Sequence, residues 1–118
     1  MKNILVAEDN ESNYILMTYI LRRYYQYQRA KNGLEAVDAV ERGGIDLVLM
    51  DLKMPVMDGL EATAKIKEKY PSLPVVALTA NAFESDREQA MSAGCDDFLS
   101  KPVSSEKCLA AIERLIGK

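Results

Sequence analysis

Hydrophobic residues are grouped along this chain in short runs that are separated by helical patterns. Three runs, at residues 4–7, 45–50 and 75–78, are almost continuously apolar and are bounded by polar or turn residues. Runs of this length predict strands that are buried on both faces of a parallel sheet. Residues 25–28 alternate between tyrosine and glutamine, which indicates an edge strand with one face in water. Residues 97–100 predict a weaker fifth strand at the other edge.

Five helical segments are expected between and after these strands. The third begins at Asp58-Gly59 and ends near Lys69, before Pro71, and the fourth covers residues 84–93, before Gly94. In the other three, apolar residues recur at spacings of three and four, which predicts one buried face. The expected buried residues are Tyr14, Met17, Leu21 and Tyr24 in the first helix, Leu34, Val37 and Val40 in the second, and Leu109, Ile112 and Leu115 or Ile116 in the last, over residues 104–116. The expected N-caps are Asn10 or Ser12 for the first helix and Ser104 or Ser105 for the last.

Strand and helix therefore alternate five times along the chain. This order predicts an α/β fold in three layers, a doubly wound (βα)5 parallel sheet with helices on both faces and right-handed crossovers. Functional residues of such sheets gather at the carboxyl ends of the strands. Because the 118 residues contain no repeat, low-complexity segment or interdomain linker, we expect one domain over residues 1–118.

Charge and hydropathy exclude several classes of protein. The formal net charge is −3 and the basic residues are scattered, so direct nucleic-acid binding is not expected. No apolar stretch approaches the roughly 20 residues of a membrane span. The first six residues contain an apolar run that is too short for a signal peptide. We therefore expect a cytoplasmic protein without direct membrane contact.

Cysteine and histidine content narrows the chemistry further. Cys95 and Cys108 have the wrong number and spacing for a zinc or redox motif, so we expect small core residues in a reducing compartment. The chain contains no histidine, the usual general base and the commonest metal ligand. Any metal that binds here must therefore be a hard cation with oxygen ligands.

Polar residues follow four of the apolar runs. Glu8 and Asp9 follow the first strand, Asp51 the third, Thr79 the fourth and Lys101 the fifth, so all should meet at one edge of the sheet. Each alone has an ordinary explanation as a helix cap, a strand end or a surface charge. Together, three carboxylates repel one another at neutral pH and favour a bound cation, for which Mg²⁺ is suited. A carboxylate beside Mg²⁺ can accept a phosphoryl group, with an ammonium and a hydroxyl to bind its oxygens.

Four segments carry a resemblance to a known family. Residues 7–10, 49–59, 77–80 and 98–102 are similar, in order and spacing, to the signature segments of response-regulator receiver domains, over essentially the whole chain. The sequences of residues 8–10 and 79–82 most resemble those of receivers of hybrid sensor histidine kinases. The resemblance implies the flavodoxin-like strand order 2-1-3-4-5, which the chemotaxis member of the family also has.

The resemblance also implies a role for each site residue. Asp51 is the expected phosphoacceptor, and Lys101 the expected phosphate-binding lysine, joined to Pro102 by a cis peptide. Glu8, Asp9 and Asp51 would bind Mg²⁺, together with the backbone carbonyl of Lys53. Many receivers have Asp where this chain has Glu8, which is still a carboxylate.

A conformational switch is implied in the same way. Thr79 would move toward the phosphoryl group, Phe98 would turn inward, and the surface formed by residues 83–108 would change its shape and partner preference. Ala80 is small and would leave the site open, whereas the side chains of Lys53 and Asn81 would tune the lifetime of the phosphate. The domain would promote its own phosphorylation and dephosphorylation without being an enzyme on a separate substrate.

The expected partner is a phosphohistidine donor, because the chain has no histidine of its own. This donor would be a sensor histidine kinase or a histidine phosphotransfer domain, docking near Asn13, Tyr14 and Met17. Three alternatives remain. An aspartate-nucleophile phosphatase needs a second acid two residues after the nucleophile, where this chain has Lys53. A flavodoxin-like cofactor binder is disfavoured because Glu8 and Asp9 after the first strand would repel a phosphate, and the third alternative is a binding module that is not phosphorylated. The chain is either a stand-alone regulator or the receiver of a longer protein such as a hybrid kinase.

Overall fold

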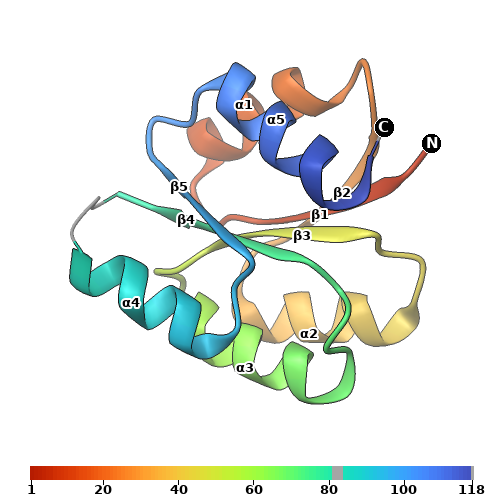
Figure 1. Ribbon diagram of the computed structural model, residues 1–118. Coiled ribbons are helices and arrows are strands. Elements are labelled where there is room, and N and C mark those ends of the chain that lie inside the picture. The colour runs from red at the N-terminus through yellow and green to blue at the C-terminus, as the bar shows by residue number, and fades with distance from the viewer. Residues whose placement is uncertain (81–83, 118) are drawn as a thin grey trace.

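A parallel five-stranded sheet lies between two layers of helices (Figure 1). The computed structural model describes residues 1–80 and 84–117. The strands are β1 (Asn3–Ala7), β2 (Gln26–Ala30), β3 (Leu47–Asp51), β4 (Val75–Thr79) and β5 (Asp97–Ser100). The helices are α1 (Glu11–Leu21), α2 (Gly33–Arg42), α3 (Gly59–Lys69), α4 (Glu84–Ala93) and α5 (Ser105–Ile116). The order β2-β1-β3-β4-β5, with parallel pairs throughout, confirms the predicted fold and strand order.

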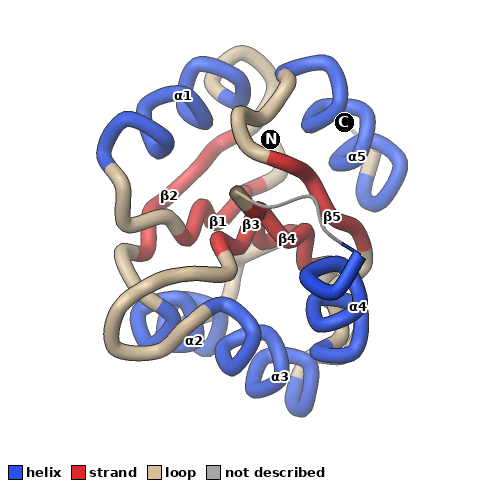
Figure 2. Tube along the Cα trace, turned by 90° about the vertical axis from the view of Figure 1, so that its left-hand side faces the viewer, coloured by secondary structure: helices blue, strands red, loops and turns tan. Residues whose placement is uncertain are grey.

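The two helical layers cover opposite faces of the sheet. Helices α1 and α5 lie on one face, and α2, α3 and α4 lie on the other (Figures 1 and 2). Side chains alternate across β1, so Ile4 and Val6 join the apolar cluster under α1 and α5, whereas Leu5 and Ala7 join the cluster on the other face. Every residue of β3 and β4 is buried, as expected for central strands covered on both faces.

The bounds of four strands differ from the prediction by one or two residues. β1 begins one residue earlier, at Asn3, and β4 ends one residue later, at Thr79. β2 begins one residue later than expected, at Gln26, and ends two residues later, at Ala30; Tyr25 before it is buried, donates its N–H to the Leu21 carbonyl (2.9 Å) and donates its hydroxyl to the Gly117 carbonyl (3.2 Å). β3 begins at Leu47, two residues later than expected, and extends to Asp51. The extension matters for function because it places the Asp51 carboxyl group at the end of a fully buried strand.

Local hydrogen bonds define the helix ends. Asn10 caps α1 by accepting a hydrogen bond from the Asn13 N–H (3.0 Å), and Ser104 caps α5 by accepting one from the Lys107 N–H (3.4 Å). The structure thus selects Asn10 and Ser104 from the predicted pairs. Helix α4 is followed by Gly94, which has a positive φ of 109° as expected after a helix end.

The buried faces of the helices contain smaller side chains than predicted. Leu34 is 46% exposed, and α2 instead faces the sheet with the residues Ala36, Ala39 and Val40. Tyr24 lies beyond the end of α1 and is also 46% exposed. Helix α5 buries Cys108, Ala111 and Ile112, while Leu109, Leu115 and Ile116 are partly buried. Small side chains let a helix approach the sheet closely, so the larger residues of α2 lie at the margin of the contact.

Both cysteines are core residues, as predicted. Cys95 and Cys108 are free and buried, and burial raises the pKa of their thiols to about 11 and about 12 respectively. They therefore stay protonated and unreactive at neutral pH. In the part of the chain that the structure describes, no helix combines the length and the hydropathy needed to cross a bilayer.

Candidate functional site

The predicted site residues lie together at the carboxyl ends of the strands. Glu8 directly follows β1, Asp51 ends β3, Thr79 ends β4 and Lys101 directly follows β5. Glu8, Asp51 and Thr79 are 0%, 4% and 5% exposed, so polar groups are buried where the sheet opens to solvent. Buried polar groups require partners, and the partners here are mostly one another.

Lys101 connects the two buried carboxylates. Its Nζ lies 2.8 Å from Glu8 Oε1 and 3.2 Å from Asp51 Oδ2. The Lys101 backbone N–H donates to the Thr79 carbonyl (2.7 Å), and the Lys101-Pro102 peptide is cis, as predicted. The two ion pairs hold the ammonium group over the middle of the sheet although Lys101 follows an edge strand.

Three carboxylates form a group that fits a small cation. Oxygens of Glu8, Asp9 and Asp51 lie within 4.8 Å of one another, with Asp9 exposed on the solvent side. Asp51 Oδ1 accepts a hydrogen bond from the Lys53 N–H (3.2 Å), and Glu8 Oε2 accepts one from the Asn10 N–H (3.3 Å). Glu8 Oε1 is buried and, apart from its ion pair with Lys101, accepts no hydrogen bond from the described residues. A set of oxygen ligands that includes a buried carboxylate oxygen without a hydrogen-bond donor other than Lys101 suits Mg²⁺.

The electrostatics of the cluster favour a proton or a cation. Burial, and then the neighbouring Glu8 carboxylate, raise the pKa of Asp51 from 3.8 to about 7, although Lys101 and the Lys53 amide act in the opposite direction. Burial alone would lower the pKa of Lys101, but the carboxylates of Glu8 and Asp51 outweigh it and raise that pKa. The ammonium therefore stays charged at neutral pH, while the Asp51 carboxyl group is close to its titration midpoint.

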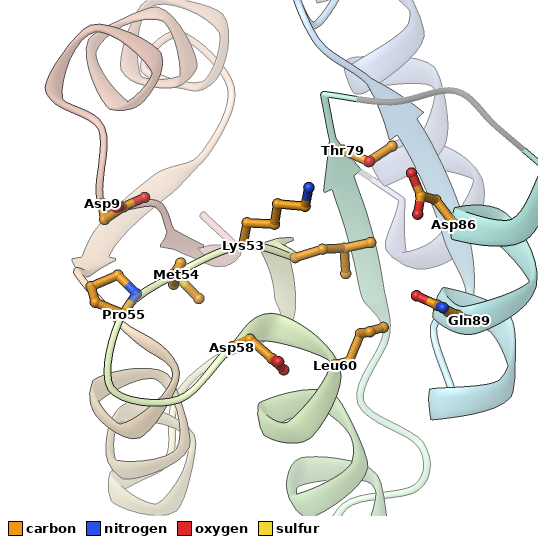
Figure 3. Close-up of a pocket in the computed structure, with 10 residues that line it drawn as sticks. Asp9, Lys53, Met54, Pro55, Asp58, Leu60, Thr79, Asp86 and Gln89 are labelled. Atoms are coloured by element: carbon orange, nitrogen blue, oxygen red, sulfur yellow. The ribbon is translucent and has the colours of Figure 1, made fainter.

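A pocket of about 450 Å³ opens beside the carboxylates (Figure 3). Asp9, Lys53 and Thr79 face it from three different strand ends, and Asp86 and Gln89 face it from α4. The sequence analysis missed Asp86 and Gln89, since in a charge-rich helix nothing in the sequence distinguishes the residues that face a pocket. The complete lining comprises Asp9, Leu52, Lys53, Met54, Pro55, Asp58, Leu60, Thr79, Asp86 and Gln89.

The loop between β3 and α3 is tightly constrained. Gly59, the first residue of α3, donates its N–H to the Leu52 carbonyl (3.0 Å), and a Cβ atom at position 59 would lie 2.1 Å from the Asp51 carbonyl oxygen. Only glycine allows the chain to return this closely to the strand that carries Asp51. Val56, at the tip of the loop, is 78% exposed and has a φ of +68°, a strained conformation for a β-branched residue.

The remaining predicted residues have varied positions. Lys53, Ala80 and Pro102 are exposed, and Phe98 is half-buried against the apolar cluster that faces α2, α3 and α4. Asn81 lies outside the described residues. One expectation is wrong: Met17 is 1% exposed and packs in the core under α1, so it cannot contact a docking partner.

Comparison with known sequences identifies the family of the chain. The sequence model of the response regulator receiver domain family matches residues 4–113. Hybrid signal transduction histidine kinase B of Dictyostelium discoideum is 38% identical over 92% of the chain, and the chain spans 6% of that kinase. The polar-differentiation response regulator DivK of Brucella anthropi is 35% identical, over 98% of the chain and 97% of DivK.

Solved structures give the same result. The receiver domain of sensor histidine kinase PA1611 from Pseudomonas aeruginosa, with a magnesium ion coordinated in its active-site cleft, has a TM-score of 0.92 and 37% identity, covering 99% of this chain and 98% of that one. A co-crystal structure of the Saccharomyces cerevisiae histidine phosphotransfer protein Ypd1 with the receiver domain of Ssk1 has a TM-score of 0.91 and 34% identity. The match covers 97% of this chain and 88% of that one.

A doubly wound sheet with an acidic, lysine-bridged site at its carboxyl edge is the fold and site expected of a receiver domain. The chain belongs to the response regulator receiver domain family, and it is a signalling domain of two-component systems. The predicted similarity to receivers of histidine kinases is confirmed by the relatives from Dictyostelium and Pseudomonas.

Proposed function

We propose that this domain accepts a phosphoryl group on Asp51 from a phosphohistidine donor and changes conformation in response. The observation that carries the proposal is the position of the Asp51 carboxylate. One oxygen lies 3.2 Å from the Lys101 ammonium and the other 3.2 Å from the Lys53 N–H, with two further carboxylates beside it. The Asp51 carboxylate is held in place, lines a second pocket of about 220 Å³ together with Glu8, Asp9 and Lys101, and has cationic support for incoming phosphoryl oxygens.

In the proposed reaction, an ionised oxygen of Asp51 attacks the phosphorus atom. The new O–P bond forms as the P–N bond of the donor phosphohistidine breaks, and the electron pair of that bond returns to the imidazole nitrogen. Lys101 then pairs with a phosphoryl oxygen instead of with Asp51, and the Thr79 hydroxyl donates a hydrogen bond to another. This exchange of partners links the chemical step to the strand ends that carry Lys101 and Thr79.

Glu8, Asp9, Asp51 and the Lys53 carbonyl are the proposed ligands of Mg²⁺. The chemistry that a bound Mg²⁺ supplies is the neutralisation of negative charge on the carboxylates and the phosphoryl group. The buried Oε1 oxygen of Glu8 and the raised pKa of Asp51 both support a cation at this point. This donor set also supports acceptance of phosphate over the alternative of an inert binding module.

The conformational response is proposed to use Thr79 and Phe98. A new dianionic group beside Thr79 attracts its hydroxyl, and Phe98 on the neighbouring strand β5 moves into the space released. Helix α4 contributes Asp86 and Gln89 to the same pocket, so its contacts also change. We propose that the surface of α4, β5 and α5 is the part that signals to an output partner.

The proposed donor is a sensor histidine kinase or a histidine phosphotransfer protein, with α1 as the docking surface. The outer face of α1 exposes Ile15 (45%), Leu16 (37%) and Tyr19 (59%), which replace Met17 in the predicted surface. An apolar outer face on a helix beside the site is suited to a helical partner. We also assign the domain to the cytoplasm, where its two free cysteines would remain reduced.

The direct test is the intact mass of the protein after incubation with Mg²⁺ and acetyl phosphate. We expect a labile gain of one phosphoryl group that requires Mg²⁺ and is absent from Asp51→Asn. Asp38→Asn is the matched control, because Asp38 is exposed on α2 outside the pocket lining and should leave the gain intact. No gain in the wild type, together with no Mg²⁺ binding, would refute the proposal and favour the inert binding module.

A further inference from the structure

The side chain of Arg29 ties the edge strand β2 to the loop that carries the acidic pair. Its guanidinium makes three polar contacts with this region: Nε donates to the Glu8 carbonyl (3.2 Å), Nη2 to the Asp9 carbonyl (3.4 Å) and Nη1 to the Glu11 carboxylate (2.7 Å). The guanidinium carbon also lies 4.3 Å from the centre of the Tyr14 ring. Although β2 is at the edge of the sheet, the Arg29 side chain is only 15% exposed.

We infer that Arg29 is a positioning residue for the Mg²⁺ ligands Glu8 and Asp9. This inference rests on the proposed function, which makes those two carboxylates metal ligands. Glu8 and Asp9 lie between the last residue of β1 and the Asn10 cap of α1, where the main chain leaves the sheet. Main-chain orientation in such a loop determines where its side chains point, so whatever binds its carbonyls also positions its carboxylates.

Residues of β2 bind both the N–H and the carbonyl of Glu8. The Glu8 N–H donates to the Ala30 carbonyl (3.0 Å), which continues the pairing of β1 with β2. The Glu8 carbonyl accepts a hydrogen bond from Arg29. The Asp9 carbonyl binds a second nitrogen of the same planar group. Rotation of either peptide would therefore break a contact with a rigid guanidinium, which the Tyr14 ring and the Glu11 carboxylate keep in place.

Two physical effects of Arg29 on the metal have opposite signs. As a cation near the site, Arg29 repels Mg²⁺, so loss of its charge alone would strengthen binding. As a positioning residue it lowers the freedom of two ligands, so loss of its hydrogen bonds would weaken binding. The direction of the change on substitution therefore distinguishes the two effects. The ion pair with Glu11 offsets part of the charge of Arg29 and favours positioning as the larger effect.

The experiment is a titration of the full chain with magnesium chloride, followed by backbone amide chemical shifts. We expect Arg29→Met to raise the dissociation constant of Mg²⁺ about tenfold, a typical effect of removing a group that orients metal ligands. Arg29→Lys keeps the charge, but a single ammonium cannot replace the fork that binds both carbonyls, so we expect weakened binding again. Arg114→Met is the matched control: Arg114 pairs with Asp97 on the opposite edge strand, and the dissociation constant should be unchanged.

A second readout separates positioning from a general structural role. With acetyl phosphate as donor, Arg29→Met should require about tenfold more Mg²⁺ for half-maximal phosphorylation yet reach a near wild-type rate at saturation. A merely structural role would lower the unfolding temperature and leave the dissociation constant unchanged. Unchanged or tighter Mg²⁺ binding by folded Arg29→Met overturns the inference; if that variant does not fold, the same result with Arg29→Lys overturns it. Failure of the wild type to bind Mg²⁺ overturns the proposed metal site itself.

Discussion

The buried carboxylate of Asp51 should make the metal-free domain less stable at neutral pH than in mild acid. Its pKa in the folded protein is about 7, against 3.8 for an ordinary aspartate, chiefly because of burial and next because of Glu8. The folded state therefore keeps a proton that the unfolded chain has already lost between these two values. Linkage requires the stability contribution of this group to be fully present below about pH 4 and to be lost as the pH rises through about 7.

The size of the effect follows from the same two values. The difference between 3.8 and about 7, at about 1.4 kcal/mol per pH unit, gives an upper bound of about 4 kcal/mol. Water and side-chain movement around the ionised pair reduce this value, so we expect about 2 kcal/mol for the removal of the charge by Asp51→Asn. For a domain of this size that corresponds to a rise in unfolding temperature of roughly 5–10 °C.

The assay is thermal and urea unfolding followed by circular dichroism, in excess EDTA, from about pH 4 to about pH 8. Asp51→Asn should be more stable than the wild type at the alkaline end of this pH range, and the difference in stability should shrink toward the acidic end. Mg²⁺ should stabilise the wild type and close the gap, because it replaces the proton as the neutralising charge. Asp38→Asn, which changes an exposed carboxylate of α2, is the matched control. A gap that is absent at about pH 8, or that does not vary with pH, would refute the reasoning.

Four further changes test other parts of the structure. Lys101→Met leaves two buried carboxylates without their cation and should lower the free energy of urea unfolding by about 2 kcal/mol in EDTA; no loss would contradict the ion-pair argument. Gly59→Ala introduces a Cβ atom at 2.1 Å from the Asp51 carbonyl oxygen and should lower the free energy of urea unfolding by about 2 kcal/mol; an unchanged value would contradict the close approach. Val56→Gly relieves a positive φ at an exposed residue and should raise the free energy of unfolding by about 1 kcal/mol, and a fall would argue against strain. Tyr19→Ala should slow phosphoryl transfer from a phosphotransfer protein but not from acetyl phosphate, and equal slowing of both would remove α1 as a docking surface.

Much of the site was predictable because a parallel sheet aligns the carboxyl ends of its strands. Glu8, Asp51, Thr79 and Lys101 each follow or end an apolar run, so the topology alone brings them together. The strand order itself came from the family resemblance, since a pattern of alternating strands and helices is compatible with more than one order.

Other features depend on geometry that residue patterns do not contain. Leu34 was expected in the core because its spacing from Val37 and Val40 follows a helical pattern, but the buried face of α2 contains Ala36, Ala39 and Val40 instead. Met17 was expected both in the buried face of the first helix and at the docking surface, and its 1% exposure bears out only the buried position. The contacts of Arg29 require the register of β2 against β1, which places Ala30 opposite Ala7 and the guanidinium beside the loop.

The acceptor site is assembled from elements that differ in how firmly they are held. Asp51 lies at the end of a fully buried strand, whereas Glu8 and Asp9 leave an inner strand and are held at their carbonyls by Arg29 from the edge. Lys101 follows the opposite edge strand and offsets part of the negative charge of the buried carboxylates of Glu8 and Asp51. In the proposed reaction Lys101 changes partners when Asp51 is phosphorylated, so we expect the strand end that carries Lys101 to move. The ion pairs of Lys101 would thereby couple the chemistry at Asp51 to the β5 side of the domain, where the proposed output surface lies.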